Sequence, residues 1–273
     1  MDGAFEVPCP VLEDDGERPG KTPRSRMAFV HHVAQRVAYA HGWRSAPQDA
    51  RYLGAGLTYD TYYVALGDEG LAVRVPHGGA ERDQPDRAAR VAWLLGELDR
   101  VDFRHRLPRP LALVSAGRSR TVVVQSFVPG VPLTQNSALR IDCAEALGQV
   151  AAAVHALPVG DMPDVMPAFL DCTEQGEVEL EVFEDDDAPV TADALAWCRA
   201  HMPPPDACCL VHGDLLGQNV HAFMESDYAI GYAVLDWENA CVGDPAYDLA
   251  VVTRGRRHPF GKGRGNLARL LEA

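Results

Sequence analysis

Apolar and polar positions alternate through much of the first half of the chain and recur at helical spacing through the second half. In the segment LAVRVP, every second residue from Leu71 onward is a large aliphatic one, while Ala72 and Arg74 share the opposite face. The segments RYLGAG, YDTYYVAL, PRPLALVSAG and RTVVVQSFV indicate further strands, bounded by glycine-containing turns. Strands followed by helices predict an α+β protein with two lobes.

Helical spacing of apolar residues is typical of amphipathic helices that pack on one face. For the first such pattern, Ser25 is the expected N-cap and Gly42 the expected stop. The predicted helices start at Met27, span 86–100, 138–156 and 190–201, and begin again at GNLARLLEA.

Changes in composition divide the chain into three parts. Residues 1–24 form an irregular extension that is acidic and then basic, and 25–127 form a mainly β N-lobe. The segment VPGVPL, 128–133, has the composition of a turn and is the expected hinge, so 128–273 form the C-lobe. Within it, 171–187 hold nine carboxylates and no Lys or Arg, which favours a solvated face or loop.

The composition excludes several classes of protein. The chain is 47% hydrophobic and 23% charged, which is a globular mixture, and no apolar run approaches the length that spans a bilayer. The formal net charge of −14 opposes nucleic-acid binding and would attract cationic small molecules, the alternative being that the acidity only serves solubility. Seven cysteines without a CxxC pair indicate reduced thiols rather than a zinc site or disulfides, as in a cytoplasmic protein with no signal peptide.

The strongest chemical signal is LVHGDLLGQNV, 210–220, in which Asp214 and Asn219 are five residues apart. The Asp and Asn of the kinase catalytic loop have the same spacing. In that chemistry the Asp reaches the hydroxyl that attacks phosphorus, and the Asn reaches a magnesium ion on the same phosphate. The alternative is that Asp214 only caps a helix.

A second acidic site follows. The segment from Val220 to Asp236 indicates a hairpin, which returns Asp236 to the end of a strand, where its carboxylate can complete an oxygen site for magnesium. The alternative is that Asp236 is only a turn residue at the end of the strand. In VGDPAYDLA, Asp244 is expected to cap the helix that carries Asp248, while Glu238 is expected to be structural.

These motifs resemble the aminoglycoside phosphotransferase and choline kinase group of small-molecule kinases. The resemblance rests on HGDLLGQN at 212–219 and on LDWENACVGDPAYDLA, with GQVAAAVHALP and VQSFVPGVPL also similar, and it covers about 50–260. It implies a bilobal protein kinase-like fold, with a small antiparallel-β N-lobe and a mainly helical C-lobe around ATP. The chain ends 25 residues after Asp248, whereas members of the family usually continue with more helices. We therefore expect a shortened C-terminus, and either a fragment or an open substrate pocket.

The resemblance also implies roles for single residues. Asp214 would be the catalytic base, Asn219 and Asp236 would hold Mg²⁺, and His212 and Asp248 would support the loop. Nucleotide binding would fall to Gly56, Thr58, Ala72 and Arg74. Arg74 stands where kinases have a lysine. The candidate partners on the following helix, Asp86 and Glu97, do not match the position of the kinase glutamate.

The expected function is transfer of the γ-phosphate of ATP, or of GTP, to a hydroxyl of a small, cationic substrate. An aminoglycoside or related aminated antibiotic is the first expectation, while macrolide, choline, homoserine and fructosamine kinases fit the same motifs. The alternatives are a catalytically impaired nucleotide-binding module and a gene fragment, because Arg74 replaces lysine, the helix glutamate is missing and the C-terminus is short.

Overall fold

The protein divides into two compact units in a computed structural model. Unit 1 comprises Met1–Gly130 and Phe223–Glu238, and unit 2 comprises Val131–Ala222 and Asn239–Ala273. The sequence predicted one division of the chain, at 128–133. In the structure the chain also returns to unit 1 with Phe223–Glu238. The structure describes residues 6–19, 22–77, 84–117, 120–135, 141–159, 166–185, 188–204, 206–226, 229–253 and 266–273.

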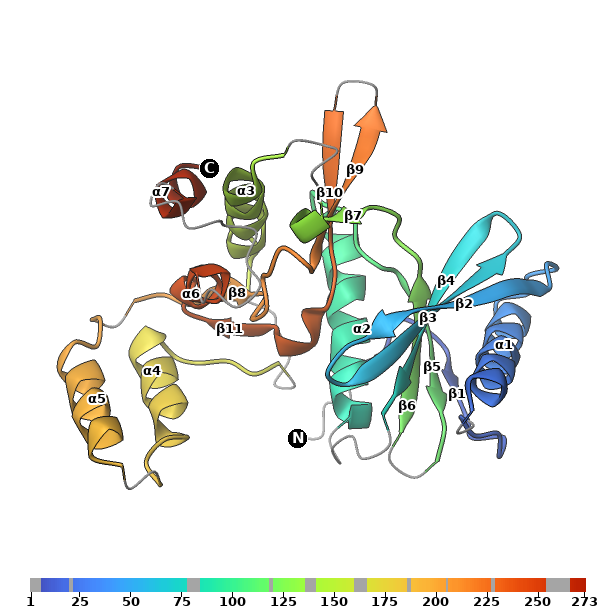
Figure 1. The fold of residues 1–273 in the computed structure, drawn as a ribbon, viewed down its shortest axis with the longest axis horizontal. Helices are drawn as coiled ribbons and strands as arrows, with labels where there is room; N and C mark the ends of the chain where they lie inside the picture. The colour runs from blue at the N-terminus through green and yellow to red at the C-terminus, as the bar shows by residue number, and fades with distance from the viewer. Residues whose placement is uncertain are drawn as a thin grey trace. The chain divides into compact units, whose positions relative to one another are not determined.

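Unit 1 is built on a six-stranded sheet with the order β1-β5-β6-β4-β3-β2 (Figure 1). Neighbouring strands are antiparallel except for the parallel pair of β1 and β5. The central strand β4 carries Leu71, Val73 and Val75 on a buried face, as the alternation predicts. The strands are β1 (Val11–Leu12), β2 (Pro47–Ala55), β3 (Tyr59–Leu66), β4 (Glu69–Pro76), β5 (Pro110–Ser115) and β6 (Thr121–Ser126).

Two helices cover opposite faces of this sheet, α1 (Pro23–Ala40) and α2 (Gln84–Arg100) (Figure 1). The sequence predicted Ser25 as the N-cap of α1, but the N-cap is Thr22. The Thr22 side chain accepts the Ser25 backbone N–H at 3.2 Å. The Ser25 hydroxyl in turn accepts the Thr22 N–H at 3.1 Å, so Ser25 is the third residue of a capping box.

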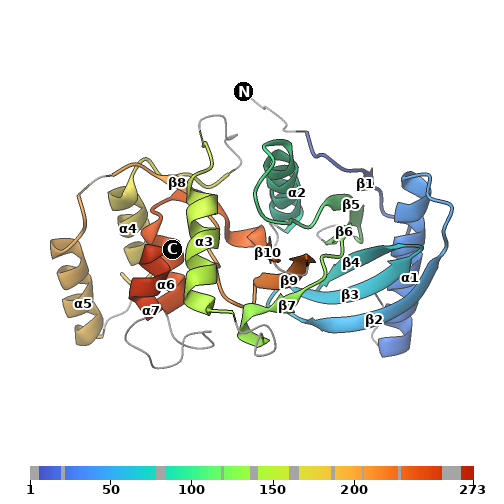
Figure 2. The same ribbon diagram turned by 90° about the horizontal axis from the view of Figure 1, so that it is seen from above.

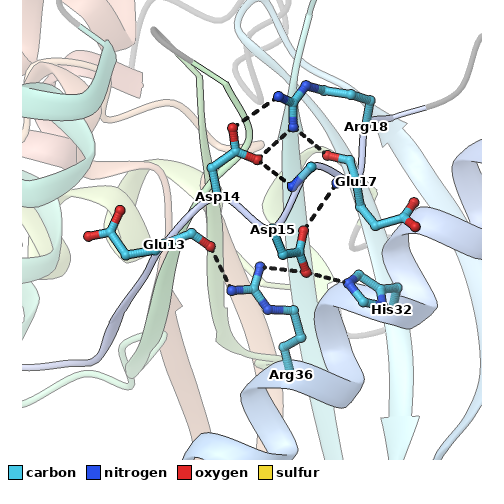
Figure 3. A network of polar contacts seen from close by, with 8 residues as sticks. Glu13, Asp14, Asp15, Glu17, Arg18, His32 and Arg36 are labelled. Carbon is cyan, nitrogen blue, oxygen red and sulfur yellow. Dashed lines mark hydrogen bonds and ion pairs between the residues drawn. The ribbon is translucent and has the colours of Figure 1, made fainter.

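The N-terminal segment is tied to α1 by a polar network, although 1–24 were expected to be irregular (Figure 3). His32 and Arg36 of α1 contact the Asp15 carboxylate at 2.7 and 3.2 Å, and Arg36 donates to the Glu13 carbonyl at 2.6 Å. The hydrogen bond from His32 lowers the pKa of Asp15 below its usual value. These contacts lie beside β1, which adds an edge strand that the sequence pattern did not predict.

Unit 2 is mainly helical, and its helices α3 and α7 pack side by side (Figure 2). Their backbones approach closely, because a Cβ on Gly148 of α3 would overlap the Leu270 carbonyl of α7. Asp142 caps α3, and the expected start at 138 lies outside the described residues. The helices are α3 (Cys143–His155), α4 (Cys172–Glu181), α5 (Pro189–Ala200), α6 (Ala246–Thr253) and α7 (Asn266–Glu272), with a short 3₁₀ helix η1 (Leu133–Gln135).

Short strands join these helices. Strand β8 (Cys209–Val211) pairs antiparallel with β11 (Cys241–Gly243), and β7 (Val131–Pro132) pairs with the start of β9 (Val220–Ser226). Strand β10 (Ala229–Val234) neighbours β9 and completes the expected hairpin.

Part of the acidic stretch forms helix α4, Cys172–Glu181, and most of its described carboxylates are exposed, as expected for a solvated face. Asp171 caps α4 by accepting the backbone N–H groups of Thr173 and Glu174 at 2.8 and 3.0 Å. The negative charge of the Asp171 cap stabilises the start of the helix. Across the described part of the chain, no helix has the length and apolar character to cross a membrane.

Candidate active-site residues

The loop after β8 brings Asp214 and Asn219 into direct contact. The Asn219 side-chain amide donates to the Asp214 carboxylate and to its backbone carbonyl, both at 2.8 Å. Backbone bonds from Leu216 to Asp214 at 2.7 Å and from Asn219 to Leu216 at 2.8 Å close the loop. With the amide nitrogen on Asp214, the Asn219 carboxamide oxygen points away from this contact.

Asp248 of α6 holds the start of the same loop. Its carboxylate accepts the backbone N–H groups of His212 and Gly213 at 2.9 and 2.8 Å. His155 of α3 contacts it through Nε2 at 3.0 Å. Asp248 and His212 are both fully buried. His155 is thus part of the support of the loop.

Backbone geometry makes Gly213 necessary at its position. Its φ is +79°, in the region that favours glycine, and a Cβ there would overlap the backbone of Asn239. The loop therefore turns where only glycine fits, next to Asp214.

In unit 1, Arg74 of β4 contacts two carboxylates that follow β10. Its Nη2 donates to Asp236 at 2.8 Å and to Glu238. Burial opposes the charge of Arg74, but the two carboxylates outweigh it and raise the pKa of Arg74 above its usual value. Burial raises the pKa of Glu238, although the charge of Arg74 works the other way. Asp236 has a φ of +68°, a strained conformation for a residue other than glycine.

Neither candidate on α2 is found beside Arg74 among the described contacts. Glu97 binds Arg100 of its own helix, with Nε at 3.0 Å, and Asp86 is exposed in the first helical turn. The partner that sequence reasoning missed is Glu238, and its only signal was a second carboxylate two residues after Asp236.

The expected nucleotide-binding residues also lie in unit 1. Gly56 and Thr58 are in the loop between β2 and β3, which His77 ties down through bonds to the Thr58 carbonyl at 3.0 Å and the Gly56 carbonyl at 3.2 Å. Ala72 is buried in β4. Tyr59 is buried after the loop, and its ring lies 4.6 Å from the Arg74 guanidinium carbon.

The expected magnesium ligands are oxygen donors of the kind the ion prefers. They are the Asn219 carboxamide in unit 2 and the Asp236 carboxylate in unit 1, whose side chain is 40% exposed. The described residues contain no cluster of three or more His, Cys, Asp or Glu side chains able to hold a metal.

Known proteins match most of the chain. A model of the phosphotransferase enzyme family matches residues 49–271. The aminoglycoside 3'-phosphotransferase of Streptomyces fradiae is 29% identical over 218 residues, which are 72% of this chain and 80% of that protein. The viomycin phosphotransferase of Streptomyces vinaceus is 27% identical over 209 residues, covering 70% and 69%.

Solved structures match the fold. The GDP and kanamycin complex of APH(2")-IIia has a TM-score of 0.64 at 16% identity, covering 89% of this chain and 82% of that chain. This likeness confirms the expected α+β, protein kinase-like fold.

Proposed function

Because the chain belongs to the phosphotransferase enzyme family, we propose that it transfers the γ-phosphate of ATP, or of GTP, to a hydroxyl of a small molecule. The observation that carries this proposal is the hydrogen bond from Asn219 to the Asp214 carboxylate. It lies in a loop whose backbone N–H groups donate to the Asp248 carboxylate. Phosphoryl transfer depends mainly on positioning and charge neutralisation, and a fixed carboxylate on a short loop provides the first of these.

Asp214 is the catalytic base of the proposed reaction. Its carboxylate orients the acceptor hydroxyl and takes its proton, while the acceptor oxygen forms a bond to the γ-phosphorus and the bond to the leaving nucleoside diphosphate breaks. Asn219 fixes the rotamer of Asp214 through the 2.8 Å hydrogen bond. His212 and Asp248 hold the backbone of the loop.

Asn219 and Asp236 would hold Mg²⁺, and their oxygen donors fit that ion. When bound, the ion neutralises charge on the transferred phosphate. Arg74 adds a fixed positive charge for the other phosphates, and an arginine can contact them through two N–H groups at once. Gly56, Thr58 and Ala72 complete the proposed nucleotide-binding residues.

The proposed acceptor is an aminoglycoside or a related aminated antibiotic. The net charge of −14 attracts cations at long range. Helix α4 and the segment after it expose Glu179, Glu181 and Asp185, while Asp186 and Asp187, which belong to the same acidic run, lie outside the described residues. Neutralising 185–187 should raise KM for a cationic acceptor, and an unchanged KM would argue against a role for this run.

The decisive experiment measures Mg²⁺-dependent release of ADP or GDP with a panel of aminoglycosides, macrolides and small amino alcohols. Asp214→Asn should remove most turnover and leave the circular dichroism spectrum and melting temperature unchanged. Asp49→Asn, an exposed aspartate on β2, is the matched control and should retain turnover. Nucleotide binding without transfer by the wild type would favour a binding module, and near-normal turnover of Asp214→Asn would exclude it as the base.

A further inference from the structure

A strand cation that contacts nucleotide phosphates needs a carboxylate to hold it in place, and in protein kinases the following helix supplies it. Here α2 follows β4, but its Glu97 is engaged with Arg100. Arg87, also on α2, carries a positive charge that opposes the rise in the pKa of Glu238 caused by burial.

Glu238, which comes from a turn far along the chain and not from the helix after β4, supplies a carboxylate for Arg74. Its carboxylate accepts a hydrogen bond from Arg74 Nη2, and the two side chains are similarly shielded, with 13% and 14% of their surfaces exposed. A charged hydrogen bond with little solvent around it is stronger than one at the surface.

The turn that carries Glu238 is itself fixed. It belongs to the 3₁₀ helix η2 (Trp237–Asn239), and the neighbouring Trp237 is 1% exposed. The Trp237 indole N–H donates to the Val234 carbonyl at 3.1 Å, and its ring is nearly perpendicular to that of Phe103, with the centroids 6.0 Å apart. Because the Trp237 side chain is buried and hydrogen-bonded, the turn that carries Glu238 is held in place.

Arg74 is thus held by three groups of different exposure. Tyr59 lies against the guanidinium, Glu238 is shielded, and Asp236 is 40% exposed. The exposed carboxylate is the one that a ligand can reach. Glu238 can therefore keep Arg74 in place when Asp236 engages a ligand.

We propose that Glu238 is the positioning residue for Arg74, taking the place of the helix carboxylate of kinases, so that Arg74 stays fixed for the nucleotide phosphates while Asp236 serves the metal. This proposal rests on the proposed function. It makes Glu238 a determinant of nucleotide affinity rather than of acceptor recognition.

The test is calorimetric titration of the purified full chain with Mg²⁺–ATP and Mg²⁺–GTP. Glu238→Gln keeps the shape and removes the charge, and it should raise the nucleotide Kd about tenfold, the equivalent of one hydrogen bond to a charged group. Glu238→Asp should lose less, since it keeps the carboxylate. Glu97→Gln, the glutamate on α2, is the matched control and should stay within about twofold of wild type.

A second measurement separates positioning from folding. Urea unfolding of Glu238→Gln, Arg74→Gln and the double variant should show coupling between the two substitutions, whereas Glu97→Gln with Arg74→Gln should be additive. In steady-state assays Glu238→Gln should raise the nucleotide KM and leave the acceptor KM unchanged.

The proposal is overturned if Glu238→Gln binds nucleotide like wild type, if Glu97→Gln weakens binding equally, or if only the acceptor KM moves. It is also overturned if the folded wild type binds no nucleotide. If the wild type binds nucleotide and phosphorylates no acceptor, the proposed function fails, while a selective loss of binding in Glu238→Gln still supports the positioning role.

Discussion

Replacing Asp248 by asparagine should uncouple the loop of Asp214 from the helix that supports it. The two Asp248 carboxylate oxygens accept three hydrogen bonds, from the His212 and Gly213 backbones and from His155 Nε2, with donor–acceptor distances of 2.8 to 3.0 Å. A carboxylate only accepts, so all three partners must donate. Asparagine has the same size but replaces one acceptor oxygen by an NH₂ donor.

The cost follows from counting these contacts. The least unfavourable amide orientation keeps its oxygen at Oδ2, where His212 and His155 donate, and turns the NH₂ toward the Gly213 N–H. One hydrogen bond to a charged group is then lost, about 1.5–3 kcal/mol, and a buried N–H loses its partner, about 1–3 kcal/mol. Since Asp248 is fully buried, solvent cannot replace either, and we expect a loss of about 3–5 kcal/mol.

Urea unfolding followed by circular dichroism and by tryptophan fluorescence measures this loss, and coincident transitions test whether a single free energy applies. Asp244→Asn is the matched control. Asp244 caps the start of the same helix by accepting the Ala246 N–H at 2.8 Å, and asparagine caps as well as aspartate, so its loss should stay below about 1 kcal/mol. A change below 1 kcal/mol for Asp248→Asn, or equal changes in both variants, would refute the reasoning.

Two further predictions follow from single positions. Gly213→Ala should destabilise by more than about 2 kcal/mol and abolish turnover, because positive φ is combined with overlap on Asn239, whereas Gly42→Ala, at a φ of +66° with open space around it, should cost about 1 kcal/mol in urea unfolding. Equal costs would contradict the role of the overlap. Burial raises the pKa of Cys9 to about 11 and that of Cys241 to about 12, so thiolate is scarce at pH 8, and iodoacetamide should label both slowly in native protein and rapidly in urea. Native labelling as fast as in urea would contradict this.

Contacts that are local in sequence were predictable. The spacing of Asp214 and Asn219 places both residues in one short loop, whose start is held by Asp248. Alternation from Leu71 onward specified a strand, because one face of a sheet must be buried. Asp244 followed by a proline likewise gave the helix start, since its side chain needs only the next backbone N–H groups.

Contacts between distant segments, and choices between near-equal local ones, were not predictable. Arg74 and Glu238 are 164 residues apart, and no periodicity links a strand to a turn so far along the chain. Thr22 and Ser25 are both good caps, and only the proline after Thr22 favours the earlier start. The strand β1 is two residues long and parallel, so it depends on β5 rather than on its own pattern.

The residues proposed for catalysis are each fixed by partners within their own unit, and this separates their effects. Asp214 is held by Asn219 and the loop in unit 2, whereas Arg74 is held by Asp236 and Glu238 in unit 1. A substitution in one set leaves the hydrogen bonds of the other set in place. Loss of Glu238, which holds Arg74, should therefore appear first in nucleotide affinity, and loss of Asp248, which holds the loop of Asp214, should appear first in turnover. The two classes of variant consequently distinguish binding from chemistry without knowledge of the acceptor.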